Sequence, residues 1–152
     1  MIRDFSPSQG NYLISDERDR LDPVAIQAYL TRSYWSPGIP IETVQKAIDH
    51  SVCVGIYDPE DRQVGFARLV TDQATFANLV DVYVLEDHRG LGLSKAMMAF
   101  ILDLPFVAGL RRFTLNTLDA HKLYEQFGFV SPSAPQSAME ILKRDIYQTA
   151  VS

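Results

Sequence analysis

The chain has 152 residues, of which 47% are hydrophobic and 22% are charged, and its formal net charge is −5. These values are typical of a globular chain, and we expect one domain over residues 1–152. The acidic balance disfavours nucleic-acid binding, and no apolar run reaches the roughly 18 residues that a membrane span needs. No export signal is visible and Cys53 has no second cysteine to pair with, which favours a cytoplasmic protein.

The first third of the chain predicts one short strand and two helices. Residues 11–15 form the strand candidate. Asp22 followed by Pro23 marks the start of a helix, because Asp22 can cap it and proline suits the first helical position. A loop with two prolines and a glycine then leads to a second helix, expected over residues 41–50.

Three consecutive antiparallel strands are expected next. Residues 51–57 and 63–70 form a hairpin around a polar turn, and a third strand ends at Val84. Gly65, inside the second of these strands, marks either a bulge or a close packing contact.

The last third of the chain predicts two helices, a strand and a hairpin. Pro105 stops the first helix, because proline cannot continue it, and Gly128 ends the second in a left-handed conformation. We expect the chain to fray from Thr149 onward. The predicted elements are a helix over 93–104, a strand over 112–116, a helix from the N-cap Asp119 to Phe127, and a hairpin that pairs 129–130 with 138–142.

The strongest functional signal is the glycine-containing turn between the strand that ends at Val84 and the helix that follows. It reads His88-Arg89-Gly90-Leu91-Gly92-Leu93-Ser94. A turn into a helix leaves backbone N–H groups without intrahelical partners, and the helix dipole favours an anion there, typically a phosphate. Gly90 and Gly92 allow close approach, and Arg89 adds a positive charge. The alternative is an ordinary tight turn.

Two familiar phosphate-binding patterns do not fit this turn. A Walker loop has glycine directly before its lysine, whereas Ser94 precedes Lys95 here. The dinucleotide fingerprint G-x-G-x-x-G needs a third glycine, and Lys95 stands at that position.

The turn does resemble the acyl-CoA signature Q/R-x-x-G-x-G/A of the GCN5-related N-acetyltransferase (GNAT) family. Residues 88–93 carry the R-G-x-G core, the strand 81–84 resembles the family's fourth strand, and residues 123–129 resemble its L-Y-x-x-x-G-F helix end. The resemblance covers residues 50–145. It implies an α+β fold with α/β/α layers, in which a mixed, mostly antiparallel sheet is splayed between its fourth and fifth strands and flanked by helices.

The resemblance also implies acetyl-CoA as co-substrate. The family often places an asparagine against the pantetheine arm after the fifth strand; Thr117 stands there in this chain, so Asn116 or Asp119 would replace it. No metal is expected, because no His, Cys or carboxylate cluster has ligand spacing. The implied cofactor-binding residues are Val82, Tyr83 and Val84, whose backbone would hold the pantetheine arm, and Arg89, Gly90, Leu91, Gly92, Leu93 and Ser94, whose N–H groups would hold the pyrophosphate.

Two residues are candidates for the chemistry. Tyr124 matches the family's usual general acid, which protonates the leaving thiolate; the alternative is an aromatic ring packed under the sheet. Asp81 alternates away from Val82 and Val84, so it is predicted to face the cleft beside Tyr83 and to accept the amine proton or bind the ammonium group. The alternative for Asp81 is a solvent-facing residue at a strand edge.

We therefore expect transfer of an acetyl group from acetyl-CoA to a primary amine by direct attack in a ternary complex. The expected acceptor is a small molecule, and the alternatives are a protein N-terminus or lysine, or an acyl-CoA-binding regulatory domain without catalysis. The resemblance implies that the loop with Trp35 and the last hairpin recognise the acceptor; the alternative for Trp35 is a ring that covers the core. A homodimer is compatible with the sequence, whereas nucleic acid and membrane are not expected as partners.

Overall fold

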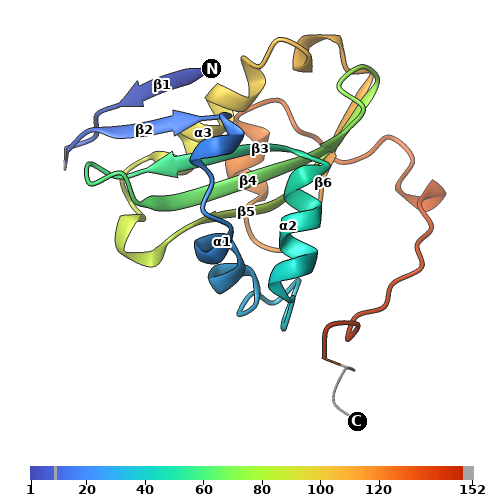
Figure 1. The fold of residues 1–152 in the computed structure, drawn as a ribbon. Helices are drawn as coiled ribbons and strands as arrows, with labels where there is room; N and C mark the ends of the chain where they lie inside the picture. Colours follow the sequence, from blue (N-terminus) through green and yellow to red (C-terminus); the bar gives the residue numbers. More distant parts are fainter. Residues whose placement is uncertain (9, 149–152) are drawn as a thin grey trace.

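The structure is a computed structural model that describes residues 1–8 and 10–148, and it is built on a single six-stranded sheet (Figure 1). Neighbouring strands are antiparallel except β5 and β6, which are parallel, so the mixed, mostly antiparallel sheet is confirmed. The expected frayed end from Thr149 lies outside the described residues. In sheet order, the strands are β1 (Ile2–Phe5), β2 (Tyr12–Ser15), β3 (Val52–Tyr57), β4 (Gln63–Thr71), β5 (Phe76–Val84) and β6 (Arg112–Leu115).

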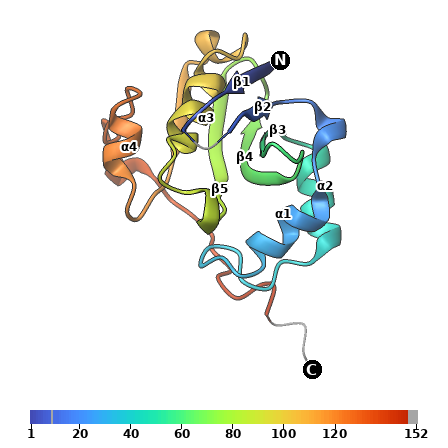
Figure 2. The ribbon, with the colours of Figure 1, turned by 90° about the vertical axis from the view of Figure 1, so that its left-hand side faces the viewer.

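Helices cover both faces of the sheet, which confirms the expected α+β layers. Figure 2 shows α1 and α2 on one face and α3 with α4 on the other. None of the helices among the described residues is long and apolar enough to cross a membrane. The helices are α1 (Pro23–Leu30), α2 (Ile41–Asp49), α3 (Leu93–Leu102) and α4 (His121–Glu125).

Each face of the sheet has its own apolar core. On the α3 face, Met97, Phe100 and Ile101 are fully buried against β3, β4 and β5. On the other face, Ile26 of α1 and Val44 of α2 pack in a second buried cluster. The start of α1 agrees with the prediction: a side-chain oxygen of Asp22 accepts a hydrogen bond from the Ala25 N–H at 3.1 Å, and Pro23 is the first helical residue.

A β-bulge in β5 shapes the region of the predicted site. Tyr83 of β5 pairs with Phe66 of β4, but Val80 pairs with Arg68, so β5 takes three steps where β4 takes two. The extra residue falls at Asp81, whose φ of +56° lies in the left-handed region.

The bulge changes which side chains face which core. Ala77 and Leu79 pack in the α3-side core, and after the bulge Val82 and Val84 pack in that core too. They come three and five positions after Leu79, where a regular strand would turn them to the opposite face. Strand β6 pairs only with residues 76–79 of β5, so no strand among the described residues lies beside the rest of β5 on that side. The expected splay of the sheet is therefore present, between β5 and β6.

Strand β1 was not predicted from the sequence. It is a four-residue edge strand in which exposed and half-buried residues alternate, and Arg3 forms an ion pair with Asp103 beyond the end of α3, at 2.9 Å. Gly65 satisfies both of its predicted interpretations. The register of β3 and β4 shifts beside it, and a Cβ on Gly65 would lie 2.7 Å from Ile56 Cδ1.

The prediction of Asp119 as N-cap was wrong. Helix α4 begins at His121, its N-cap is Ala120, and the Ala120 N–H donates instead to Thr117 Oγ1 at 3.0 Å. The threonine turn takes the place of the expected cap and leaves Asp119 exposed. Gly128, with φ of +94°, ends the helical segment as expected.

The predicted last hairpin is absent, because the described residues after β6 contain no strand. Phe129 packs on Phe113 of β6 with ring centroids 5.2 Å apart, but the chain then runs outside the sheet (Figure 1). It returns to the fold at Tyr147, which packs against the α1–α2 core. The two prolines of residues 131–137 accompany a 3₁₀ turn in place of the expected strand pairing.

Candidate functional site

The predicted anion-binding turn lies directly after the splayed part of β5. A single 3₁₀ turn at residues 86–88 leads to Arg89, and α3 begins at Leu93. Gly90 and Gly92 have φ values of +80° and +82°, which other residues rarely adopt. Among the described residues, no atom outside residues 89–91 lies within 4 Å of where a Cβ of Gly90 would be, so the turn is open to a ligand there.

The turn presents a row of unused hydrogen-bond donors. Among the hydrogen bonds of the described residues, none uses the backbone N–H groups of residues 90–95, and the first intrahelical donor of α3 is the Ala96 N–H, 3.0 Å from Gly92 O. Helix α3 also lacks a side-chain cap. Six consecutive N–H groups at the positive end of a ten-residue helix form a site suited to a phosphate.

Arg89 connects the turn to β5. Its Nε donates to Val84 O at 2.9 Å and one of its terminal nitrogens donates to the Tyr29 hydroxyl at 3.2 Å. The arginine therefore uses the carbonyl of Val84, while about half of its side chain stays exposed at the rim of the turn. Nearby, Glu86 has its pKa lowered to about 2, chiefly because Arg32 donates a hydrogen bond to its carboxylate.

Asp81 lies on the α1–α2 face of the sheet, as its position in the strand predicts. Its carboxylate is not free of partners there but belongs to a polar cluster. One of its oxygens accepts from Trp35 Nε1 at 2.9 Å and the other from Arg68 Nε at 2.8 Å. Arg68 also donates to Ser51 Oγ at 3.0 Å. The side chains of Asp81 and Arg68 are 9% and 19% exposed, so this ion pair is largely buried.

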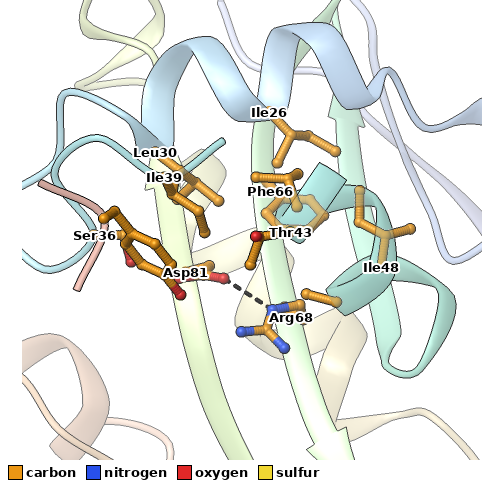
Figure 3. A pocket seen from close by; sticks show the side chains of 12 residues that line it. Ile26, Leu30, Ser36, Ile39, Thr43, Ile48, Phe66, Arg68 and Asp81 are labelled. Carbon is orange, nitrogen blue, oxygen red and sulfur yellow. Dashed lines mark hydrogen bonds and ion pairs between the residues drawn. The ribbon is translucent and has the colours of Figure 1, made fainter. Parts of the chain in front are cut away.

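The Asp81–Arg68 pair forms the polar end of a small cavity. Figure 3 shows the pair below apolar side chains that come from α1, the α1–α2 loop and β4. The cavity has a volume of about 80 Å³, and Tyr147 from the C-terminal segment also lines it. Its other lining residues are Ile26, Leu30, Ser36, Ile39, Thr43, Val44, Ala47, Ile48 and Phe66.

Aromatic rings surround the splayed part of β5. Tyr29 of α1 stacks on Tyr83 of β5 with ring centroids 4.0 Å apart, and Trp35 meets Tyr34 edge to face at 4.9 Å. Burial raises the pKa of the Tyr83 phenol, which stays neutral. The loop with Trp35 thus contacts β5 through the Asp81 hydrogen bond.

Tyr124 is buried on the α3 side of the sheet. Its ring meets Phe129 edge to face at 5.9 Å. Burial is the main cause that raises the pKa of its phenol, and Tyr34 and the negative charge of Asp119 raise it further. The hydroxyl is therefore protonated at neutral pH, which a general acid requires.

Three polar residues near the predicted site are exposed to solvent. Asn116 is exposed directly after β6, at the open end of the splay, and Asp119 is exposed before α4. His121 is exposed as well. Within the described residues, no group of three or more His, Cys, Asp or Glu side chains is placed to hold a metal ion.

Sequence reasoning missed Arg68, Tyr29 and Tyr147 as neighbours of the site. Arg68 did carry a signal, because a charged residue inside an otherwise apolar strand requires a buried partner. Tyr29 and Tyr147 carried none, because their positions depend on how the helices and the C-terminal segment meet the sheet.

Comparisons with known proteins indicate the family to which the chain belongs. Residues 49–131 match the model of the acetyltransferase (GNAT) domain family. A candidate acetyltransferase of Gibberella zeae is 31% identical over an alignment that covers 77% of this chain and 77% of that one. The crystal structure of a candidate GNAT-family acetyltransferase from Xanthomonas campestris pv. campestris is 46% identical, with a TM-score of 0.87 over 91% of this chain and 97% of that one.

The fold is also found in more distant proteins. A Mycobacterium tuberculosis protein solved in complex with CoA and a second ligand is 18% identical, with a TM-score of 0.62 over 77% of this chain and 70% of that one. The chain belongs to the GNAT acetyltransferase family and is an N-acetyltransferase of that class.

Proposed function

We propose that this protein transfers the acetyl group of acetyl-CoA to the primary amine of a small molecule, by direct attack within a ternary complex. The observation that carries the proposal is the row of six unused N–H groups of residues 90–95, placed directly after the splayed part of β5. The open edge of β5 leads directly to these N–H groups, so one extended ligand could pair with the strand edge and place a pyrophosphate at the turn.

The residues present fit CoA. The N–H groups of Gly90, Leu91, Gly92, Leu93 and Ser94 would hold the pyrophosphate, and the open space at Gly90 leaves room for it. That a protein of the same fold was solved with CoA supports this assignment. The pantetheine amides would pair with the free edge of β5 at Val82 and Tyr83. At Val84, Arg89 would first have to release the carbonyl that it binds.

Acetyl-CoA would supply the activated acetyl group as a thioester. The amine nitrogen forms a bond to the thioester carbonyl carbon and the carbon–sulfur bond breaks. In our proposal Tyr124 donates its hydroxyl proton to the leaving sulfur, and a base takes the proton lost by the nitrogen. The raised pKa of Tyr124 supports this role, because the hydroxyl keeps its proton until sulfur needs it.

Asp81 is our candidate for the group that receives the amine. Both oxygens of its carboxylate already accept one hydrogen bond, from Trp35 and Arg68. A carboxylate oxygen has a second lone pair, so Asp81 can bind an ammonium group or accept its proton through water without losing these partners.

The cavity beside Asp81 supports a small acceptor over a peptide. Its volume of about 80 Å³ is far below the roughly 300–1,000 Å³ of pockets for drug-sized ligands. Its walls are mostly apolar and its end is the Asp81–Arg68 pair. An amine with a small apolar substituent is therefore our proposed acceptor class.

Ser94 gives a sharp test of the cofactor site. It lies in the first turn of α3, where a glutamate suits the helix dipole but repels a pyrophosphate. Calorimetric titration with acetyl-CoA is expected to show binding to the wild type and to Ser94→Gln, and binding weakened at least about tenfold in Ser94→Glu. Failure of the wild type to bind acetyl-CoA would contradict the proposal.

Thiol release separates an enzyme from a sensor. With acetyl-CoA and a panel of small primary amines, the wild type is expected to release free CoA thiol at a rate that depends on the amine. Binding of acetyl-CoA without amine-dependent thiol release for small amines or amine-containing peptides would favour the acyl-CoA-binding regulatory domain instead.

A further inference from the structure

Tyr147 is the point at which the exposed C-terminal segment meets the folded body of the chain. Of residues 135–148, it is the only one that is not exposed to solvent. Its side chain packs against the buried cluster on the α1–α2 face of the sheet, and the stretch before it runs outside the sheet (Figure 1). A single side chain therefore accounts for the burial in this stretch.

Tyr147 also forms the one wall of the small cavity that comes from outside residues 26–81. The other lining residues belong to α1, the α1–α2 loop, α2, β4 and β5. Several of them, such as Ile26, Val44 and Phe66, are fully buried core residues that the fold requires. Tyr147 is different, because it belongs to no helix or strand and its neighbours in the chain are exposed.

Packing and a close backbone approach hold Tyr147 against the cavity. In the part of the chain that the structure describes, no hydrogen bond or ion pair fixes its side chain. A Cβ on Gly38 would lie 3.0 Å from Tyr147 O, so the segment can lie against the α1–α2 loop only because residue 38 is a glycine. Removing the ring would therefore leave no buried polar group without its partner.

The cavity combines a polar end with apolar walls. Asp81 and Arg68 form its polar end, and an amine bound at Asp81 would extend its substituent between the walls (Figure 3). The space available is only about 80 Å³, and the ring of Tyr147 bounds part of it. In an apolar pocket of this kind, one additional methylene group can change the preference for a substrate by roughly 10–200-fold.

We propose that Tyr147 is a specificity-determining residue of the acceptor site, whose ring limits the substituent of the amine to a small apolar group. The inference rests on the proposed function, since it takes the cavity beside Asp81 as the place where the amine binds. The alternative is a ring that only covers the core on this face of the sheet. Removal of such a ring would lower the unfolding free energy and leave the preference among amines unchanged.

A series of straight-chain primary alkylamines tests the size limit in the full chain. Thiol release with saturating acetyl-CoA gives kcat/KM for each amine, and the quantity to compare is the ratio of kcat/KM for hexylamine to that for ethylamine. Tyr147→Ala is expected to raise this ratio at least about tenfold, because the removed ring leaves room for the longer chain. Tyr147→Phe keeps the ring and is expected to keep the wild-type ratio.

The matched control is Ile141→Ala, at a 95% exposed residue of the same segment. It truncates another large side chain but removes no wall of the cavity, so its kcat/KM for both amines is expected to equal that of the wild type.

Trp35 gives a second measurement that needs no turnover. It is the only tryptophan of the chain and donates a hydrogen bond to Asp81, so its fluorescence is expected to change when an amine binds there. Titration with the same alkylamines in the presence of CoA gives their dissociation constants. Tyr147→Ala is expected to shift the preference in binding toward hexylamine, as it does in kcat/KM.

The outcomes separate this inference from the proposed function. Amine-dependent thiol release with the same ratio in the wild type and in Tyr147→Ala overturns the role of Tyr147 and leaves the proposed function standing. Absence of thiol release with every amine contradicts the proposed function, and the Trp35 titration then decides the inference. A size limit in binding that Tyr147→Ala relaxes supports it, whereas an unchanged limit, or no response of Trp35 to any amine, overturns it.

Discussion

Replacing Asp81 by asparagine tests the polar cluster at the bulge. The φ of +56° at this position makes asparagine the suitable probe, because it tolerates left-handed backbone, whereas alanine would add strain. An asparagine has one side-chain oxygen, so it can accept from Trp35 or from Arg68 but not from both. Its amide nitrogen would then face the remaining donor.

The expected cost follows from the burial of the pair. Hydrogen bonds to charged groups contribute about 1.5–3 kcal/mol, and the Asp81 and Arg68 side chains are only 9% and 19% exposed, so solvent screens them little. We expect Asp81→Asn to lose about 2–3 kcal/mol of unfolding free energy, which corresponds to about 5–10 °C in melting temperature for a chain of this length. Urea denaturation at pH 7 measures the first quantity and calorimetry the second.

The controls separate this pair from charge in general. Asp19→Asn, at an exposed aspartate in the 3₁₀ turn before α1, is expected to change the unfolding free energy by less than about 0.5 kcal/mol. A double-mutant cycle with Arg68→Met is expected to give a coupling energy of at least about 1 kcal/mol. An Asp81→Asn protein as stable as the wild type, or a coupling energy near zero, would refute the reasoning.

Four further changes test other parts of the molecule. Tyr124→Phe should lower the turnover number by about 10²–10⁴-fold and leave the acetyl-CoA dissociation constant unchanged, and an unchanged turnover number would exclude the general-acid role. Tyr57→Phe should raise the unfolding free energy by about 1 kcal/mol in urea denaturation, because the Tyr57 hydroxyl is buried without a hydrogen-bond partner among the described residues. A lower unfolding free energy would show that the hydroxyl does form a hydrogen bond. Gly65→Ala should destabilise it by about 1–3 kcal/mol, since the new methyl group would overlap Ile56, and Gly109→Ala, where the space is open, is the control. Burial raises the pKa of Cys53 to about 11 from 9.0, so the buried thiol stabilises the fold fully below pH 9 and loses that contribution as the pH rises to 11. The difference in unfolding free energy between wild type and Cys53→Ala should therefore shrink by about 2–3 kcal/mol between pH 8 and 11. A difference that does not change with pH would contradict the raised pKa.

Local chemistry made much of the site predictable. Asp22 with Pro23, and Gly90 with Gly92, act through their own backbone preferences and hydrogen bonds, so the start of α1 and the turn before α3 could be placed from the sequence. The side assigned to Asp81 followed from strand alternation near the bulge. Its partners, Trp35 and Arg68, come from distant parts of the chain, and no local pattern pairs them with it.

The errors have physical causes as well. Strand β1 is short and carries charged residues, so its pattern is no stronger than that of a loop. Asp119 has the chemistry of an N-cap, but Thr117 makes the turn two residues earlier. Residues 138–142 have a strand-like sequence, but the described residues contain no strand after β6, so the alternation there predicted a pairing that the fold does not make.

The bulge at Asp81 also determines how β5 tolerates changes in length. The extra residue shifts the alternation of side chains by one position, so that Val82 and Val84 face the same core as Ala77 and Leu79. Deleting Asp81 would remove the bulge and restore the ordinary period of two, and Val82 and Val84 would still face the same core as Ala77 and Leu79. A deletion at Asp81 should therefore disturb the core packing of β5 less than a deletion of Asn78, which leaves the bulge in place and turns Phe76 and Ala77 to the opposite faces of the strand.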